Sequence, residues 1–425
     1  MLIKIKALYL ILLFSYNYLL SYNLFYGNLH SHTSYSDGQS VPSHAFVFAR
    51  DTARIDVFAV TDHGELLTVS EWADIKRQAG SATIPNRFLG LAGFEWTNPI
   101  LGHINIFNTD DYTNCLLNPT MVSIYNWMAN RTNAIGQFNH PAVQNYNSFA
   151  FSPIGDVSMA FFELQNKDHA KRYYVPLDSG WQVGIVANQD NHSANWGKGN
   201  RLTGIWADSL TKNSIISAFQ NMRTFGTLDR NFQFWFKANG SWMGSIIPNG
   251  EIQFEVFCLD PDSADFIHRV DVVTNNNTIL DSIILGNINH VEWQTTTFTN
   301  NYENRYFFIR VIENDSNYIL SSPIWTEGGV AIDNQRKIES ESYKISANPF
   351  TSSITINFNS NYLKDLDRIK IYSAAGKVIK NFLPKPVIRW DGKDNKGNEV
   401  PAGVYFVSFE KSGNRHSEKI LRLGH

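Results

Sequence analysis

Histidine, aspartate and glutamate residues recur at the ends of apolar, strand-like runs throughout the first half of the chain. The series begins in YGNLHSHTSYSDG, where one residue separates His30 from His32. Several segments between the runs have helical spacing, so a β/α barrel would gather these residues at the face where such barrels hold their active sites. The pattern therefore predicts a metal centre at one end of a barrel. The residues of the series are His30, His32, Asp62, His63, Glu95, His103, His140, Asp190 and His192, and Asp37 in the YSDG segment is a further candidate.

The pattern of the chain predicts three structural parts. Residues 24–231 alternate strand-like runs, such as DVFAV, RFLGLAGF, HINIF, AIGQF, AFFEL and VGIVAN, with helix-like runs, such as PSHAFVFARDTA, TVSEWADIKRQA, PTMVSIYNWMANRT and TKNSIISAFQNM. Residues 232–328 consist of short alternating runs between NG, NNN and DSN turns, which is typical of a β-sandwich. After a polar linker at 329–342, residues 343–425 again have the pattern of a small β domain.

The N-terminus predicts export. Residues 1–23 begin with Lys4 and Lys6 and continue as an apolar run that suits a signal peptide better than a membrane span, so we expect no transmembrane segment in the mature chain. The net charge of −3 and the lack of a basic run give no indication of an obligatory nucleic-acid partner. Cys115 and Cys258 are the only cysteines and fall in different predicted domains, so no disulfide framework is expected.

The spacing of the predicted metal ligands indicates which of their side chains could face the same ion. In a strand, His30 and His32 point to the same side, and Asp190 with His192 repeats this spacing. Asp62 and His63 are adjacent and cannot both face one ion from an extended strand. We therefore predict His63 as the ligand and Asp62 as the carboxylate that orients a metal-bound imidazole. Asp37, in YSDG, is either a ligand or an Asp-Gly turn.

The composition of this set indicates the metal and the reaction. Imidazole and carboxylate without thiolate suit two or three divalent ions of Zn²⁺, Mn²⁺ or Fe²⁺. The carboxylate of Glu95 can bridge two ions, and clustered ions activate water for hydrolysis. We therefore expect a hydrolase of a small-molecule substrate, with Glu95, Asp190 and His192 as the catalytic residues. No G-x-S-x-G, Walker or dinucleotide motif competes with this interpretation.

Residues 26–231 resemble the PHP (polymerase and histidinol phosphatase) family. The shared elements, in order, are H-x-H-T with S-D-G behind it, T-D-H, a glutamate after the third strand, H-P and a late D-x-H. The resemblance implies a distorted (β/α)7 barrel and a trinuclear site. It assigns His30, His32, Glu95 and Asp190 to one ion, Glu95, His103 and His140 to a second, and Asp37, His63 and His192 to a third. Some members of the family have histidine at the position of Asp37.

Within that family, four segments are similar to the carbamate-hydrolase-like (CehA/McbA) branch: GHINIF, GNRLTGIWADSLT, FQNMRTFGTLDRN and YILSSPIW. The branch includes carbamate and ester hydrolysis, whereas many other PHP proteins cleave phosphoesters. Arg201 and Arg223 could supply contacts to a phosphate, or could be ordinary loop and helix-end arginines. We expect phosphoesters as the substrate class, with carbamates or carboxylic esters and amides as the alternative.

Residues 343–425 resemble the type A sorting domain of the type IX secretion system. The matching segments are SANPF, IKIYSAAGKVI, WDGKDNKGNEVPAGVYF and the basic-apolar strand KILRL. The resemblance implies interaction with the type IX machinery and a secreted or cell-surface location.

Two other readings compete with the PHP-like hydrolase. An amidohydrolase barrel shares the H-x-H but normally needs a metal-bridging lysine, and none stands at the end of FLGLAGFEW or HINIF. A non-catalytic surface protein could use the barrel for binding only, although the complete ligand set argues against it. Substrate identity depends on loop shape and is not encoded in the metal ligands.

Overall fold

The computed structural model describes residues 22–262, 265–301, 304–327, 343–346, 348–358, 363, 366–373, 377–411 and 414–423. The predicted linker (329–342) and the predicted signal peptide (1–23), apart from its last two residues, lie outside the described residues. Within the described ranges, the structure contains no helix long and apolar enough to cross a membrane.

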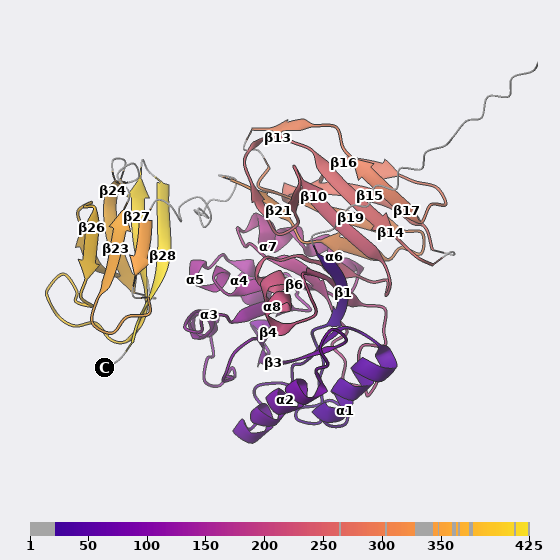
Figure 1. Ribbon diagram of the computed structural model, residues 1–425, viewed down its shortest axis with the longest axis horizontal. Coiled ribbons are helices and arrows are strands. Elements are labelled where there is room, and N and C mark those ends of the chain that lie inside the picture. Colours follow the sequence, from indigo (N-terminus) through magenta and orange to yellow (C-terminus); the bar gives the residue numbers. More distant parts are fainter. Residues whose placement is uncertain are drawn as a thin grey trace, which may run out of the picture.

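The predicted strands and helices of the first half are present (Figure 1). The strands are β1 (Asn23–Asn28), β2 (Val57–Val60), β3 (Leu89–Asn98), β4 (Gly102–Phe107), β5 (Ile135–Asn139), β6 (Met159–Leu164), β7 (Gly184–Ala187), β8 (Leu202–Ala207) and β9 (Thr224–Thr227). The helices are α1 (Pro42–Val47), which continues as a π-helical turn (Phe48–Ala53), α2 (Val69–Ala82), α3 (Met121–Ala129), α4 (Asn145–Phe149), α5 (Pro153–Asp156), α6 (Lys167–Arg172), α7 (Tyr174–Asp178) and α8 (Lys212–Gln220).

Local side-chain caps explain where the longer helices begin. Thr68 accepts a hydrogen bond from the Glu71 amide at the start of α2, and the Glu71 carboxylate accepts one from the Thr68 amide. Thr120 caps α3 and Thr211 caps α8 through the amide three residues further on. Such caps satisfy amides that have no partner within the helix.

These strands form a curled sheet in the order β9-β8-β1-β2-β3-β4-β5-β6-β7. Its two ends meet through side chains, because the Thr224 hydroxyl donates to the Ile185 carbonyl (2.8 Å) and the Ala187 amide donates to the Thr203 hydroxyl (3.0 Å). The mixed α/β class is confirmed, but the sheet departs from a regular (β/α)7 barrel. β4 runs antiparallel to both of its neighbours, and β8 runs antiparallel to β1. Only three residues separate β3 from β4, too few for the crossover that a parallel pair requires.

An apolar cluster fills the interior of the curled sheet. Its members come from alternate positions of the strands and from one face of α8: Leu29, Val57, Ala59, Leu89, Leu91, Phe107, Ile135, Phe161, Val186, Ile205, Ile215, Ala218 and Phe219. The intervening strand residues, such as Phe58 and Val60, join a second core that contains residues of α1 and α2. The interior of the curled sheet is therefore a packed core that supports the strand ends, as the interior of a β/α barrel does.

The next part consists of short strands, as predicted for a sandwich. They are β10 (Gln233–Ala238), β11 (Ser241–Trp242), β12 (Ile246–Ile247), β13 (Gly250–Ile252), β14 (Phe254–Leu259), β15 (Ile267–Thr274), β16 (Thr278–Ile284), β17 (His290–Gln294), β18 (Phe298–Asn300), β19 (Tyr306–Glu313), β20 (Tyr318–Ser321) and β21 (Ile324–Thr326). One sheet has the order β11-β10-β14-β17, and an apolar core lies between it and β15 and β19.

The second layer of this sandwich is continuous with the barrel. β20 pairs antiparallel with β9, with Ile319 opposite Thr227 and Ser321 opposite Phe225. A single hydrogen-bonded sheet therefore runs from β12, β21, β19 and β20 into the barrel strands. The sequence pattern did not indicate this continuity.

The C-terminal part is a small two-sheet β domain with its own core (Figure 1, yellow). Its sheets are β22-β23-β26 and β25-β24-β27-β28. The strands are β22 (Tyr343–Ser346), β23 (Ile354–Phe358), β24 (Leu366–Ser373), β25 (Val378–Phe382), β26 (Val387–Trp390), β27 (Gly403–Lys411) and β28 (Asn414–Arg422).

Candidate metal centre

The predicted ligands come together at one end of the barrel. Most follow or end a parallel strand: His30 and His32 come after β1, His63 after β2, His140 after β5, and Asp190 with His192 after β7. Glu95 lies near the end of β3. His103 lies at the start of β4, and it reaches the same edge because β4 runs antiparallel to β3 and pairs His103 with Thr97.

Glu95 is at the middle of the group, and its Oε1 atom faces three imidazoles. This oxygen lies 3.3 Å from His30 Nε2, 3.3 Å from His103 Nδ1 and 3.5 Å from His140 Nε2. The side-chain amide of Asn139 also donates to Oε1 (2.7 Å). The Glu95 side chain is only 1% exposed, so burial and this hydrogen bond fix its orientation.

The other oxygen of Glu95 faces a second set of ligands. Oε2 lies 2.8 Å from His63 Nδ1 and 3.7 Å from His32 Nε2. On the outer side of these rings, Asp37 Oδ1 lies 3.4 Å from His63 Nε2 and 3.3 Å from His192 Nε2. Asp37 Oδ1 also lies 3.7 Å from His32 Nδ1, so the carboxylates of Glu95 and Asp37 approach the imidazoles of His32 and His63 from two sides.

Asp190 completes the inner part of the centre. Its Oδ1 atom lies 3.2 Å from His30 Nε2 and 3.2 Å from His32 Nε2, and these two nitrogens are 3.2 Å apart. Asp190 and His140 have left-handed backbone conformations, with φ of 50° and 30°. Left-handed φ at residues other than glycine costs roughly 1–3 kcal/mol and persists where the surroundings impose it, often at functional sites.

The donor atoms match the needs of divalent transition-metal ions. Ligand atoms lie within 4.8 Å of one another in four overlapping groups: His32, Asp37, His63 and His192; His30, His32 and Glu95; His30, His140 and Asp190; and Glu95, His103 and His140. The Nδ1 atom of His103 is buried and has no hydrogen-bond partner among the described residues. A buried imidazole nitrogen that faces a carboxylate at 3.3 Å without a well-formed hydrogen bond suits an imidazole–carboxylate metal site.

The electrostatics of the centre favour positive charge. Burial alone would lower the pKa of His30, but the carboxylates of Asp190, Glu163 and Glu95 outweigh it and hold the pKa well above its usual value. Burial would raise the pKa of Glu95, but the surrounding imidazoles, His30 first, hold it well below the usual range. The pKa of His32 is lowered, mainly by burial. Carboxylates that stabilise buried imidazolium would equally stabilise a bound cation.

Glu163, which the sequence analysis did not select, lies directly behind the ligands. Its Oε1 atom is 2.9 Å from His30 Nδ1, and its Oε2 atom accepts a hydrogen bond from the His140 amide (2.7 Å). The side-chain amides of Gln137 and Asn188 also donate to Oε1 (3.1 Å each). Glu163 stands near the end of AFFEL, so a carboxylate closing an apolar strand was the signal that could have identified it.

Asp62 has a different contact from the one predicted. Its carboxylate accepts hydrogen bonds from the Thr33 amide (2.7 Å), the Thr33 hydroxyl (2.6 Å) and the Ser36 hydroxyl (2.5 Å). The Ser36 hydroxyl in turn lies 3.4 Å from His32 Nδ1. Asp62 therefore holds the loop after His32 and reaches an imidazole only through Ser36, because the β2 end aims it toward that loop.

Arg201 and Arg223, the two candidates for substrate contacts, lie at opposite ends of the barrel strands. Arg201 Nη1 donates to the Gln165 carbonyl (3.2 Å), just beyond the end of β6 and beside the centre. Arg223 Nε donates to the Trp206 carbonyl (3.2 Å), and Trp206 pairs with Leu24 at the start of β1. Because the centre lies beyond the other end of β1, the structure does not bring Arg223 to the centre, which favours the alternative of an ordinary helix-end arginine.

The centre opens to solvent on one side. His30, His32 and Glu95 are essentially buried, whereas Asp37 is 49% exposed and His192 is 40% exposed. Asp37 and His192 therefore form the solvent side of the centre, and the buried ligands lie beneath them.

Comparison with known proteins identifies the C-terminal domain. Residues 344–422 match the family model of the secretion system C-terminal sorting domain, which confirms the prediction for this part. Such a domain indicates export through the type IX machinery to the cell surface or the medium. No curated protein matches the chain significantly.

Several solved structures are similar at low identity. A two-domain protein from Bacteroides vulgatus, described as containing a predicted PHP-like metal-dependent phosphoesterase, is 14% identical with a TM-score of 0.42, covering 69% of this chain and 91% of that one. PsfC from Pseudomonas syringae is 15% identical with a TM-score of 0.34, covering 46% and 88%. PorZ, a surface component of the type IX secretion system of Porphyromonas gingivalis, is 11% identical with a TM-score of 0.17, covering 53% and 42%.

Proposed function

We propose that the barrel is a secreted metal-dependent hydrolase that acts on phosphoesters. The observation that carries this proposal is the position of Glu95, whose two carboxylate oxygens each face a different set of imidazoles. A carboxylate in this arrangement can bridge two ions. Bound divalent ions would supply Lewis acidity and a water of lowered pKa, which is the chemistry of hydrolysis.

The residues of the chain would have distinct tasks in this reaction. Glu95, His30, His32 and Asp190 would form the buried part of the centre, with His103 and His140 at its side. His63, Asp37 and His192 would hold the outer part, next to the solvent. Glu95, Asp190 and His192 remain the proposed catalytic residues: Glu95 could bridge two ions, Asp190 contacts both His30 and His32, and His192 lies on the solvent side of the centre.

A specific observation favours a second candidate, hydrolysis of a carbamate or carboxylic ester. Phosphate recognition commonly uses arginine side chains that contact the anion directly. Of the two arginines predicted for that task, only Arg201 lies beside the centre. A substrate that needs fewer cationic contacts would fit this arrangement, as in the carbamate-hydrolase-like branch that parts of the sequence resemble.

The decisive experiment combines metal analysis with an activity panel on the purified full chain. We expect two or three equivalents of zinc, manganese or iron by elemental analysis, and turnover of aryl phosphomonoesters or diesters that chelation abolishes. Turnover of a carbamate or aryl ester, with none of any phosphoester, would instead establish the second candidate. Less than one equivalent of metal after supplementation would refute both, and metal binding without any hydrolysis would favour a binding protein.

A matched pair of variants connects the metal to the activity. Glu95→Gln keeps the shape of the side chain but removes the bridging charge, so we expect loss of at least one metal equivalent and a fall in kcat of roughly two orders of magnitude or more. Glu292→Gln makes the same chemical change on an exposed strand of the sandwich and should leave both quantities unaltered. Similar kcat values for the two variants would place Glu95 outside the reaction.

A further inference from the structure

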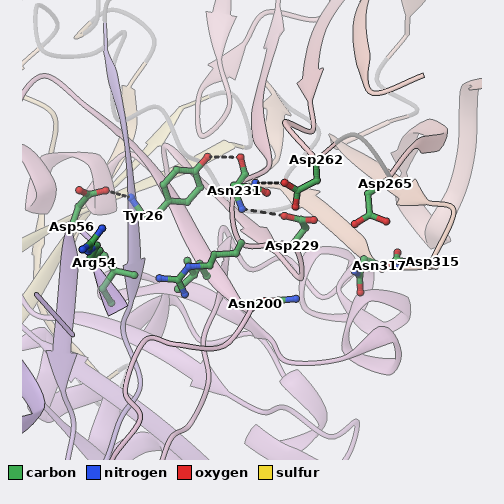
Figure 2. Close-up of a pocket in the computed structure, with 13 residues that line it drawn as sticks. Tyr26, Arg54, Asp56, Asn200, Asp229, Asn231, Asp262, Asp265, Asp315 and Asn317 are labelled. Atoms are coloured by element: carbon green, nitrogen blue, oxygen red, sulfur yellow. Dashed lines mark hydrogen bonds between the residues drawn. The ribbon is translucent and has the colours of Figure 1, made fainter. Parts of the chain in front are cut away.

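A second cluster of carboxylates lies away from the metal centre, at the junction of the barrel and the sandwich. It borders a cleft of about 390 Å³ where the β9–β10 connection meets the loops that follow β14 and β19 (Figure 2). Asp229, Asp262 and Asp265 have carboxylate oxygens within 4.8 Å of one another. Asp229, Asp262, Asp265 and Asp315 line the cleft, and the buried carboxylates of Asp260 and Glu313 interact with them electrostatically from within the sandwich. These six residues are here called the acidic cleft.

Two members of the acidic cleft are buried carboxylates with unsatisfied oxygens, although Asp260 Oδ1 accepts a hydrogen bond from the Asp262 amide (2.8 Å). Asp260 is 0% exposed and Glu313 is 1% exposed. Asp260 continues the inward alternation of Val256 and Cys258, and Glu313 continues that of Ile309 and Val311, so both point between the two layers of the sandwich. Neither oxygen of Glu313 nor Oδ2 of Asp260 has a hydrogen-bond partner among the described residues.

The side chain of Asn231 adds a neutral amide oxygen next to the carboxylates of Asp229 and Asp262. The side-chain amide of Asn231 donates to Asp262 Oδ1 (3.1 Å), and its backbone amide donates to Asp229 Oδ1 (3.0 Å). Asn231 Oδ1 is itself buried and lacks a partner in the described part of the chain. Figure 2 shows Asn231 beside the carboxylates of Asp229 and Asp262, with a hydrogen bond to each.

No basic side chain of the described residues neutralises this negative charge. Arg54 and Arg230 line the cleft, but Arg230 donates to the carbonyls of Gly197, Gly199 and Ala53. Within the described residues, none of the six carboxylates forms an ion pair with lysine or arginine.

Buried carboxylates of this kind are costly unless they are paired, hydrogen-bonded or bound to a cation. We propose that the acidic cleft is a calcium-binding site that fastens the sandwich to the barrel. Calcium takes six to eight oxygen ligands in flexible geometry, and the cleft offers carboxylate and amide oxygens without the imidazoles of the metal centre. The proposed ligands come from the β9–β10 connection, which leaves the barrel, and from the sandwich loops that follow β14 and β19. A bound ion would therefore join the barrel to the sandwich.

The test uses the full chain, first loaded with transition metal so that the metal centre is filled. Calcium is then titrated by calorimetry, and the thermal midpoint is measured with calcium and with a calcium-selective chelator. We expect one further equivalent of calcium to bind saturably and the thermal midpoint to rise. Absence of saturable calcium binding by the wild-type chain would overturn the proposal.

Two double variants locate the site. Asp262→Asn with Asp265→Asn removes repelling charges and should leave the fold intact, but it should abolish calcium binding and the calcium-dependent rise in thermal midpoint. Asp168→Asn with Asp208→Asn removes two exposed carboxylates elsewhere and should bind calcium normally. Equal calcium binding by both double variants would overturn the assignment. Glu95→Gln should also retain calcium, so failure of the hydrolase proposal and failure of this one are distinguishable.

Discussion

Glu163 illustrates, at the scale of single residues, how a ligand is positioned by a group that does not bind the ion. Metal-bound histidines commonly donate their second ring nitrogen to a carboxylate, which fixes the ring and the tautomer. In this chain, Glu163 Oε1 lies 2.9 Å from His30 Nδ1, which leaves His30 Nε2 facing Glu95 and Asp190. Four further donors hold the Glu163 carboxylate, so its orientation is fixed before any ion binds.

We expect Glu163→Gln to weaken metal affinity or activity by about 10- to 100-fold, because an amide supports the imidazole less strongly than a carboxylate does. Titration of the metal-free protein with zinc, followed by activity at saturating zinc, measures both effects. The full metal count should return at high zinc, which distinguishes a positioning residue from a ligand. An affinity equal to that of the wild type would contradict the role.

Arg201 and Arg223 form a natural pair for testing substrate charge. Arg201 lies beside the centre, whereas the Arg223 guanidinium stacks 4.4 Å from the ring of Tyr22 at the other end of β1. A charge-assisted contact contributes roughly 1.5–3 kcal/mol only where an anion receives it.

Arg201→Ala should therefore raise KM for a phosphoester and leave KM for a neutral aryl ester nearly unchanged. Arg223→Ala should lower the thermal midpoint without selective change in KM, and equal KM changes for both substrates in Arg201→Ala would mark Arg201 as structural.

At the scale of elements, the loop between β1 and α1 connects the buried and exposed parts of the centre. The amide of Gly38 donates to the Thr33 carbonyl (2.9 Å), which folds the loop back onto the strand end and places Asp37 over the imidazoles. A Cβ atom at position 38 would lie 2.5 Å from the carbonyl carbon of His32. Backbone atoms cannot move aside as a flexible side chain would, so this loop needs glycine.

Gly38→Ala should therefore displace Asp37 and lower the metal content by one equivalent, the ion assigned to Asp37, His63 and His192. Elemental analysis against the wild type measures the loss. Gly80→Ala is the matched control, because a Cβ at position 80 in α2 meets no atom within 4 Å. That variant should keep all its metal and gain about 0.5–1 kcal/mol of stability, since alanine is the better helix residue. Full metal content in Gly38→Ala would show that the loop tolerates the added methyl group.

At the scale of the whole molecule, the barrel and the sandwich are joined, whereas the C-terminal domain has a core of its own. The pairing of β20 with β9 makes the barrel sheet and one sandwich sheet continuous. In contrast, the C-terminal core contains only residues from the segment between Tyr343 and Ile420. The first two parts should unfold together, and the third should unfold by itself.

Deletion of residues 343–425 should therefore leave the metal content, the kcat and the main thermal transition unchanged. Calorimetry of the full and shortened chains measures this, and the shortened chain should lose one separate transition. In cells, we expect the shortened chain to remain in the periplasm, because the sorting domain is missing. Aggregation or a lowered main transition in the shortened chain would mean that the boundary cuts through a shared core.

The sequence by itself determined the parts of this protein that depend on local pattern. Strand runs such as DVFAV and AFFEL, and the helix that begins at Thr68, lie where periodicity and capping residues predict them. Most of the nine predicted ligands lie close together because residues at the ends of parallel strands meet at one edge, whereas His103 reaches that edge at the start of the antiparallel β4. The C-terminal sorting domain was recognisable because its motifs are contiguous in the chain.

Only the tertiary structure determined which side chains and strands that are distant in the sequence contact each other. Local pattern cannot show that β4 and β8 run antiparallel to their neighbours, that β20 extends the barrel sheet, or that Arg223 lies at the far end of β1. Local pattern also predicted that Asp62 orients an imidazole, but the end of β2 directs its carboxylate toward Thr33 and Ser36. The carboxylate that contacts the His30 imidazole belongs to Glu163. These contacts join residues far apart in the chain, and their partners are chosen by strand direction and register, which a single sequence does not specify.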